Sequence, residues 1–288
     1  MRRASRGARI GEYMTVTNAV ETTMIWGTVS GASMVGMVIS LLLSVVLPIF
    51  LGIFIYKKTK AWVPAFFIGC GIFVGFAMIL EQICHAIVLT VTGSAIRDNI
   101  WLYAIYGGLA AALFEECGRW IAMKFCLKKH LTRENALMYG AGHGGIEAFL
   151  ILGMSSMSNL LTAAMINGGL MEKTMTALEP AQQEVTYHQL SVLWTTPAYQ
   201  FYLAPVERIS AIALQIALSI LVYSAVKTGR KLHLAAAFGL HFAVDFLTVV
   251  CASTIPTWAL ELGLLMVVAV ICVAVYKLAY VSSTEKKA

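Results

Sequence analysis

The sequence predicts an all-α, polytopic membrane protein, a bundle of about seven transmembrane helices. Of its 288 residues, 59% are hydrophobic and 12% are charged. Soluble domains carry about 25% charged residues, so this chain has too few to cover a surface that faces water. The mean hydropathy is +0.78, and the apolar residues occur in runs of about 20 or more, the length that spans a bilayer. This composition excludes a disordered chain, a nucleic-acid-binding domain and a disulfide-stapled secreted module.

The first three apolar runs each end at basic or polar residues, as spanning helices do at the membrane surface. We predict helices over residues 34–56, 62–91 and 100–127, followed by Lys57 and Lys58, by Arg97, Asp98 and Asn99, and by Lys128 and Lys129. The segment 24–36 is also apolar. It either extends the first helix or lies separately at the membrane interface, which would make an eighth helix.

Four further spans are predicted, over residues 136–166, 204–226, 232–253 and 256–280. A long polar stretch separates the first two of these. It is compatible with a short amphipathic helix over residues 184–193.

Basic residues are concentrated in every second loop. The first, third and fifth loops carry lysines and arginines, among them Lys57, Arg133 and Lys231, whereas the fourth loop is net acidic. Cytoplasmic loops are enriched in these residues. We therefore predict an N-terminus outside and a C-terminus in the cytoplasm.

Neither a repeat nor a linker divides the chain, so residues 34–280 are predicted to form a single membrane-embedded domain. Residues 1–33 form an N-terminal tail, whose arginine-rich first 13 residues precede Met14 and are interpreted as a non-native upstream extension or a disordered tail. Residues 281–288 form a short cytoplasmic tail. The six cysteines lie in apolar runs without a CxxC pair, so we predict neither a disulfide nor a cysteine metal site.

Ionisable side chains occur inside several of the predicted spans, where they are costly and indicate function. In the third, fourth and sixth spans they are three or four residues apart, so each group lies on one helical face. The pairs are Glu115/Arg119, Glu116/Arg119, His143/Glu147 and His241/Asp245. Because a polar face is unfavourable in lipid, all three faces are expected to point into the bundle.

The three groups are also predicted to lie at one depth. With a rise of 1.5 Å per residue, the two glutamates lie about 12–14 Å from Lys124. His143 and His241 each lie about 15 Å from the basic residue that begins their helix. The helices were measured from separate loops, so this agreement predicts that their polar groups meet in one site.

Acidic groups exceed basic groups in this site, where four carboxylates face only Arg119. The carboxylates are those of Glu115, Glu116, Glu147 and Asp245. Protonated carboxyl groups, protonated histidines or one divalent cation would balance the charge. Two histidines and a glutamate with one position open to water form a catalytic zinc pattern. We therefore predict a divalent metal, zinc by its ligand types, at His143, His241 and Glu116.

Further polar residues lie nearer the outer face. Glu81 and His85 in the second span, with Glu207 and Arg208 in the fifth, form either a second polar cluster or the upper wall of the first. Glu261 is expected near the outer surface, in contact with water.

Small residues surround His143, namely Gly140, Gly142, Gly144 and Gly145. Such residues let helices approach closely in lipid, and they could also leave room for a bound peptide backbone. Gly71 and Gly75 form a GxxxG spacing that is compatible with close helix packing.

These motifs resemble those of the YhfC family of intramembrane metalloproteases. That family belongs to the superfamily of type II CAAX prenyl proteases, bacteriocin-processing proteases and PrsW-like proteases. The resemblance covers the chain from the first to the sixth span. It is carried by four motifs: EECGR at 115–119, GHGGIE at 142–147, Glu207-Arg208 and HFAVD at 241–245.

The resemblance implies a role for each matched residue. Glu115 or Glu116 would activate water as the general base, and Arg119 would orient them as an ion-pair partner. His143 matches a histidine of the CAAX proteases, whereas Glu147 could fill the position of a glutamate that PrsW-like members use.

The last motif matches His241 and Asp245, which would hold metal or stabilise the oxyanion. The first motif departs from the CAAX pattern, since it has two residues rather than three between the glutamates and the arginine. The resemblance therefore does not extend to a CAAX-type substrate.

We expect an intramembrane metal-dependent peptidase that hydrolyses a peptide bond in or near the membrane with a glutamate-activated water. Such a site requires a polar cavity, which we expect to open to the cytoplasm. The expected partners are membrane lipid and a peptide or membrane-protein substrate, with no nucleic acid; the oligomeric state is open. The resemblance implies the cytoplasmic membrane of a bacterium.

Two other functions remain open at this point. A non-catalytic membrane scaffold, or pseudoprotease, would lack an open water position in its polar core. An ion-coupled transporter would have discontinuous helices and repeat symmetry.

Overall fold

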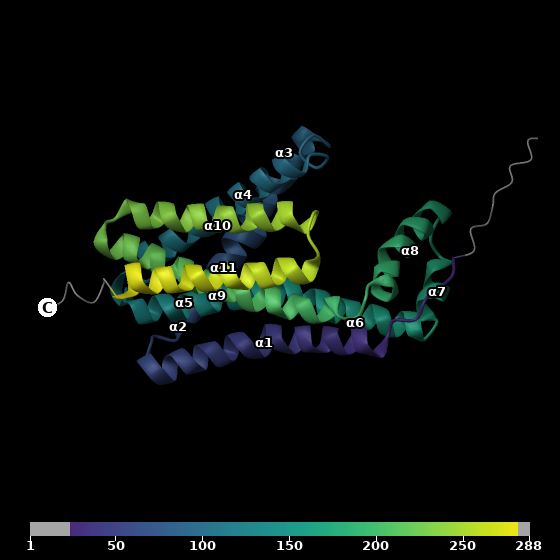
Figure 1. The fold of residues 1–288 in the computed structure, drawn as a ribbon, viewed down its shortest axis with the longest axis horizontal. Coiled ribbons are helices and arrows are strands. Elements are labelled where there is room, and N and C mark those ends of the chain that lie inside the picture. The colour runs from purple at the N-terminus through teal and green to yellow at the C-terminus, as the bar shows by residue number, and fades with distance from the viewer. Residues whose placement is uncertain (1–23, 282–288) are drawn as a thin grey trace, which may run out of the picture.

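A computed structural model describes residues 24–281, with side chains up to residue 279. The predicted extension at 1–13 and, apart from its first residue, the predicted C-terminal tail at 281–288 lie outside the described residues. All regular structure in residues 24–281 is helical (Figure 1). Seven helices are long and apolar enough to cross a membrane, so the all-α bundle and its seven predicted spans are confirmed.

Three spans are single α-helices, and the other four combine α-helical and π-helical segments. The single helices are α1 (Gly31–Thr59), α9 (Gln200–Thr228) and α10 (Lys231–Ala252). The second span joins α2 (Pro64–Phe73), the π-helix η1 (Val74–Glu81) and α3 (Gln82–Thr92). The third joins α4 (Ile100–Ile121) and the π-helix η2 (Ala122–Cys126), followed by the 3₁₀ turn η3 (Lys128–His130). The fourth joins α5 (Arg133–Ala148), the π-helix η4 (Phe149–Gly153) and α6 (Met154–Asn167), and the seventh joins α11 (Thr257–Val275) and the π-helix η5 (Tyr276–Val281).

Local sequence signals set several helix ends. Ser30, Asn99 and Thr132 cap α1, α4 and α5, because their side-chain oxygens accept hydrogen bonds from backbone N–H groups of the first turn. Gly229 follows α9 with a φ of 72°, in the left-handed region that glycine adopts readily. Because of these capping residues, the helices begin and end close to the boundaries predicted from the sequence.

The segment before α1 does not form an eighth helix. Residues 24–30 are not helical, whereas residues 31–36 belong to α1. Trp26 packs against Tyr187 and Trp194, with ring centroids 5.5 and 5.7 Å apart. Since α1 begins at Gly31, the helix starts three residues before the predicted domain boundary.

The polar stretch between the fourth and fifth spans contains two helices, α7 (Leu170–Met175) and α8 (Pro180–Thr195). The second includes residues 184–193, while the first was not predicted. Both lie beyond the ends of α10 and α11 (Figure 1). A small apolar cluster that includes Val29, Met37 and Leu193 joins α8 to α1 and α6. Asn167 adds two hydrogen bonds to the backbone of Val29, at 2.8 and 3.0 Å.

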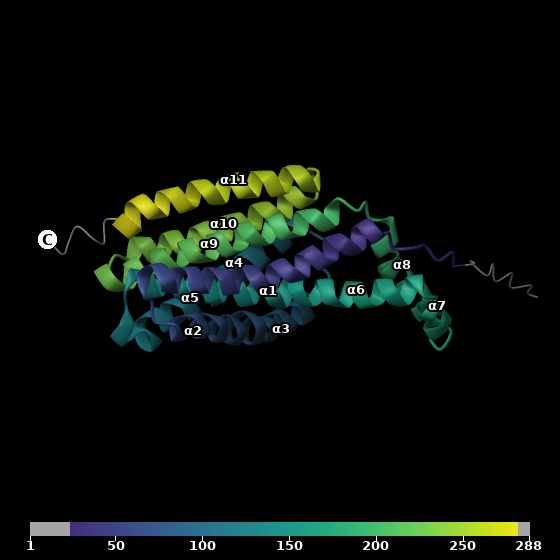
Figure 2. The same cartoon turned by 90° about the horizontal axis from the view of Figure 1, so that it is seen from below.

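The helices α5 and α9 form the centre of the bundle. α5 packs against α1, α2 and α9, and α9 packs against α1, α10 and α11. Figure 2 shows α11 at one edge and α2 with α3 at the other. Of the most apolar 18 residues of α9, 72% are buried, against 33% or less in the other six spans. The central helices are therefore the ones that can carry a water-excluded polar site.

Glycines allow α5 to approach its neighbours closely. A Cβ atom on Gly142 would lie 2.0 Å from the carbonyl oxygen of Phe66, and one on Gly69 would lie 2.2 Å from that of Tyr139. The packing role predicted for the glycines of α5 is confirmed. Gly71 and Gly75 are different, since a Cβ on either would have nothing within 4 Å. The prediction that Gly71 and Gly75 pack closely against another helix is wrong, because α2 contacts α5 through Gly69 instead.

Candidate metal centre

Three side chains from neighbouring helices bring possible metal-ligand atoms together at the centre of the bundle. Glu115 comes from α4, and His143 and Glu147 come from one face of α5. One donor atom from each residue lies within 4.8 Å of the other two. His143 Nε2 lies 2.9 Å from Glu115 Oε2, and all three residues are buried.

Gln215 of α9 links these groups and was not predicted from the sequence. Its Nε2 donates to Glu115 Oε2 at 2.9 Å and to Glu147 Oε2 at 2.7 Å, and its Oε1 accepts from Arg119. A guanidinium only donates and an ionised carboxylate only accepts. The amide oxygen must therefore face Arg119, and the amide nitrogen must face the two glutamates. The available signal was the single carboxamide in the predicted fifth span, residues 204–226.

Glu116 has different partners from Glu115. Its Oε1 accepts from Arg119 and lies 2.8 Å from His241 Nδ1. All three residues are buried, and Arg119 has no exposed surface. With Nδ1 held by Glu116, the other ring nitrogen of His241 lies 3.5 Å from Asp245 Oδ2. Glu116 therefore orients His241 through Oε1, while its Oε2 is buried and has no hydrogen-bond partner among the described residues.

A cavity of about 350 Å³ lies beside these groups. It is lined from α4, α9, α10 and α11 and from the middle of the fourth span. Its ionisable and amide side chains are those of Glu115, Glu147, Glu207, Arg208, Gln215, His241 and Asp245. A space of this size admits water, and it is within the range of ligand-binding pockets.

The cavity extends away from the lysine-bearing helix ends. Tyr103 is three residues after the start of α4, Glu207 is seven after the start of α9, and Thr248 is four before the end of α10. By the predicted topology these ends are extracytoplasmic. We expected a cavity open to the cytoplasm, and the cavity at this site extends the other way. On the opposite side, which is cytoplasmic by the predicted topology, apolar side chains such as Met123 and Met138 fill the bundle, with 0% and 1% exposure.

The outer polar residues divide into two groups. Glu81 and His85 are paired within the second span, with His85 Nε2 3.2 Å from Glu81 Oε1. His85 Nδ1 lies 2.7 Å from Tyr106 Oη on α4. Neither residue lines the cavity. This pair therefore lies outside the cavity, although Glu81 is close enough to Glu115, His241 and Asp245 to interact with their charges.

Glu207 and Arg208 form a wall of the main site. Arg208 bonds Glu207, and its Nη1 lies 3.2 Å from Glu147 Oε1. Glu261 of α11 is 8% exposed, and its Oε2 has no hydrogen-bond partner in the described part of the chain. The expectation that Glu261 contacts water at the surface is wrong, because α11 packs against α9 and buries it.

The chemistry of this donor set fits a divalent cation. Imidazole nitrogen and carboxylate oxygen are ligands that zinc accepts. Around the site, five carboxylates face two guanidinium groups, which leaves three negative charges if all are ionised. The groups are Glu115, Glu116, Glu147, Glu207 and Asp245 against Arg119 and Arg208. A bound cation would reduce this excess.

The grouping differs from the ligand set expected from the sequence. His143 lies with Glu115 and Glu147, whereas His241 and Glu116 pair with each other. Spacing and depth along the sequence predict that these residues form one polar site, but they do not predict this division.

Comparison with known proteins is consistent with this geometry. The model of the YhfC intramembrane metalloprotease family matches residues 43–272, which include every site residue described above. The "Uncharacterized membrane protein YhfC" of Bacillus subtilis (strain 168) is 41% identical over 222 residues, which cover 74% of this chain and 83% of the relative. No solved structure matches. This chain is therefore a multi-pass membrane protein that belongs to the YhfC intramembrane metalloprotease family.

Proposed function

We propose that this protein is a metal-dependent peptidase that hydrolyses a peptide bond of a polypeptide within or at the edge of the membrane. The observation that carries the proposal is the cluster formed by Glu115, His143 and Glu147 beside a cavity that admits water. These three residues would hold the cation, and zinc suits this ligand set best. Such a cation acidifies a bound water and polarises a carbonyl oxygen.

Glu115 is the residue that we expect to activate the attacking water. Its Oε2, which faces His143 and Gln215, would hold the cation, while its Oε1 makes no hydrogen bond among the described residues and would take the proton. Glu115 lines the cavity, whereas Glu116 does not. The water oxygen bonds to the carbonyl carbon, and its proton passes to Glu115. That proton then moves to the nitrogen of the breaking C–N bond, which yields a carboxylic acid and an amine.

His241 and Arg208 are placed to stabilise negative charge in the cavity. Glu116 holds His241 through Nδ1, so its other nitrogen is directed toward Asp245. Both His241 and Arg208 line the cavity. Because both ring nitrogens of His241 face carboxylates, we expect the ring to be protonated on both and to carry a positive charge. A cation of this kind and a guanidinium favour the oxyanion that forms when water attacks a carbonyl.

The geometry supports an enzyme over the two alternatives. A scaffold needs no space beside its polar core, but here a cavity of about 350 Å³ reaches that core. A transporter of the expected type has unwound breaks in its spanning helices. The second and fourth spans contain π-helical segments, yet each is continuous from Pro64 to Thr92 and from Arg133 to Asn167.

Metal content of the detergent-purified protein tests the ligand set. We expect about one divalent ion per chain in the wild type, and its loss in His143→Ala and Glu147→Ala. His188→Ala, a change at an exposed position of α8, is the control and should keep the ion. A wild type that binds no divalent ion, or variants that bind it equally well, would contradict the proposed ligands.

Hydrolysis is tested in proteoliposomes with a pool of synthetic membrane-spanning peptides. Mass spectrometry should detect new peptide termini with the wild type and none with Glu115→Gln. Products that form equally with both proteins would exclude Glu115 as the water-activating residue.

A further inference from the structure

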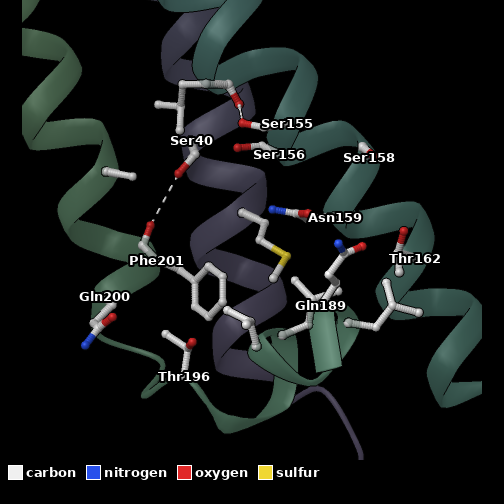
Figure 3. A pocket seen from close by; sticks show the side chains of 16 residues that line it. Ser40, Ser155, Ser156, Ser158, Asn159, Thr162, Gln189, Thr196, Gln200 and Phe201 are labelled. Carbon is white, nitrogen blue, oxygen red and sulfur yellow. Dashed lines mark hydrogen bonds between the residues drawn. The ribbon is translucent and has the colours of Figure 1, made fainter. Parts of the chain in front are cut away.

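A second cavity, of about 570 Å³, lies between α1, α6, α8 and the start of α9 (Figure 3). It shares no lining residue with the cavity at the metal-ligand group. No charged side chain lines it. Nine of its 16 lining residues carry a hydroxyl or a carboxamide, and the others are apolar. The cavity therefore suits a ligand that has hydrogen-bonding groups and apolar parts but no charge.

Several of these polar side chains have no partner within the described protein. Ser156 is only 4% exposed and makes no hydrogen bond there, and the carboxamides of Asn159 and Gln189 also make none. Figure 3 shows the three polar ends in the space between α1, α6 and α8. The neighbouring Ser155 instead donates to the carbonyl oxygen of Ile151 at 2.6 Å, as helical hydroxyls commonly do. These groups face the open space of the cavity, so their hydrogen-bonding capacity is available to a group bound from outside.

The lining favours a peptide over a carbohydrate. Hydroxyls and carboxamides both donate and accept, which matches the alternating N–H and C=O groups of an extended backbone. Met37, Leu190, Leu193 and Phe201 supply an apolar side that suits uncharged side chains. A sugar carries hydroxyls on most of its edges and would leave these apolar groups poorly matched.

The two cavities are neighbours along the fourth span and along α9, where Ala204 of the second lies one turn before Arg208 of the first. Ile151 lines the first and Leu152 lines the second. Ser156 is nine residues after Glu147 along the fourth span, which corresponds to about 13 Å. An extended peptide covers this distance in about four residues.

We infer that the second cavity is a recognition subsite that binds an uncharged, extended segment of the substrate, about four residues from the bond that is cleaved. This inference rests on the proposed peptidase function. Because the subsite contains no residue of the metal-ligand group, peptide binding to the subsite can be measured separately from peptide cleavage.

Equilibrium dialysis of the full-length protein in detergent tests the subsite. The probe is a pool of acetylated, amidated hexapeptides built from Ala, Ser, Thr, Gln and Leu. An Asp/Glu hexapeptide pool and maltohexaose serve as comparison ligands. Asn159→Trp and Gln189→Trp fill the cavity from two different helices, and Gln182→Trp on the exposed surface of α8 is the matched control.

We expect the wild type and Gln182→Trp to retain the neutral peptides, with at least about a fivefold loss of retention in both cavity variants, as expected from one lost hydrogen bond. Glu115→Gln should retain them like the wild type. Equal retention by the cavity variants, or retention of maltohexaose in place of peptides, would overturn the inference. If cleavage or metal binding fails while retention still depends on the cavity, the peptidase proposal falls and the peptide site stands.

Discussion

Gln215 offers the sharpest test of how the site is held together. The change Gln215→Leu keeps a similar volume and removes three hydrogen bonds, to Arg119, Glu115 and Glu147. Side-chain hydrogen bonds in membrane proteins contribute about 0.6 kcal/mol on average and at most about 1.7 kcal/mol. Three of them give an expected loss of about 2–5 kcal/mol in the free energy of unfolding.

A second effect should appear in the metal affinity. Residues that orient metal ligands typically change the affinity about 10–100-fold when they are removed. Titration with zinc against a competing chelator measures this change, and unfolding in a denaturing detergent measures stability. Gln189→Leu, the same substitution outside this network, is the control and should alter stability by less than about 0.5 kcal/mol. If Gln215→Leu matches the control in both assays, Gln215 does not orient the two carboxylates.

Three further changes test the surrounding structure. Arg119→Ala leaves the buried carboxylate of Glu116 without its guanidinium partner, and it should lower the unfolding free energy by about 3–5 kcal/mol; a loss below about 1 kcal/mol would contradict a buried ion pair. Gly142→Ala should lower the thermal midpoint because its Cβ would lie 2.0 Å from a carbonyl oxygen, whereas Gly71→Ala has open space and should not; equal midpoints would contradict the packing of α2 on α5. Glu81→Gln should leave the metal content unchanged, since Glu81 lies outside the metal-ligand group, and loss of the ion would place Glu81 in the site.

The convergence of three helices could be predicted because it follows from spacing and depth. Residues four apart share a helical face, and equal distances from the basic ends place the polar groups at one level. The partners of each group could not be predicted in the same way. Glu115 and Glu116 are adjacent, so they point about 100° apart. One faces His143 of α5 and the other faces His241 of α10, and this depends on how α4 is rotated in the bundle.

Close packing shows a similar limit. The GxxxG spacing of Gly71 and Gly75 is a property of one helix, whereas close approach depends on which face meets a neighbour. In the structure that face contains Gly69, opposite the backbone of Tyr139. Gln215 was missed for a related reason, because an uncharged amide indicates a site only when the charged groups around it are known.

The π-helix η4 separates the two cavities along the fourth span, with Glu147 before it and Ser156 after it. A π-helical turn accommodates an additional residue relative to an α-helix. Deleting one residue from η4 would therefore restore an α-helical turn and leave the residues after it facing nearly as before. Ser156 and Asn159 would keep their cavity and Glu147 would keep its place. Relatives could thus lose a single residue at η4 while both cavities stay in register, whereas a deletion within α6 would turn everything after it by about 100°.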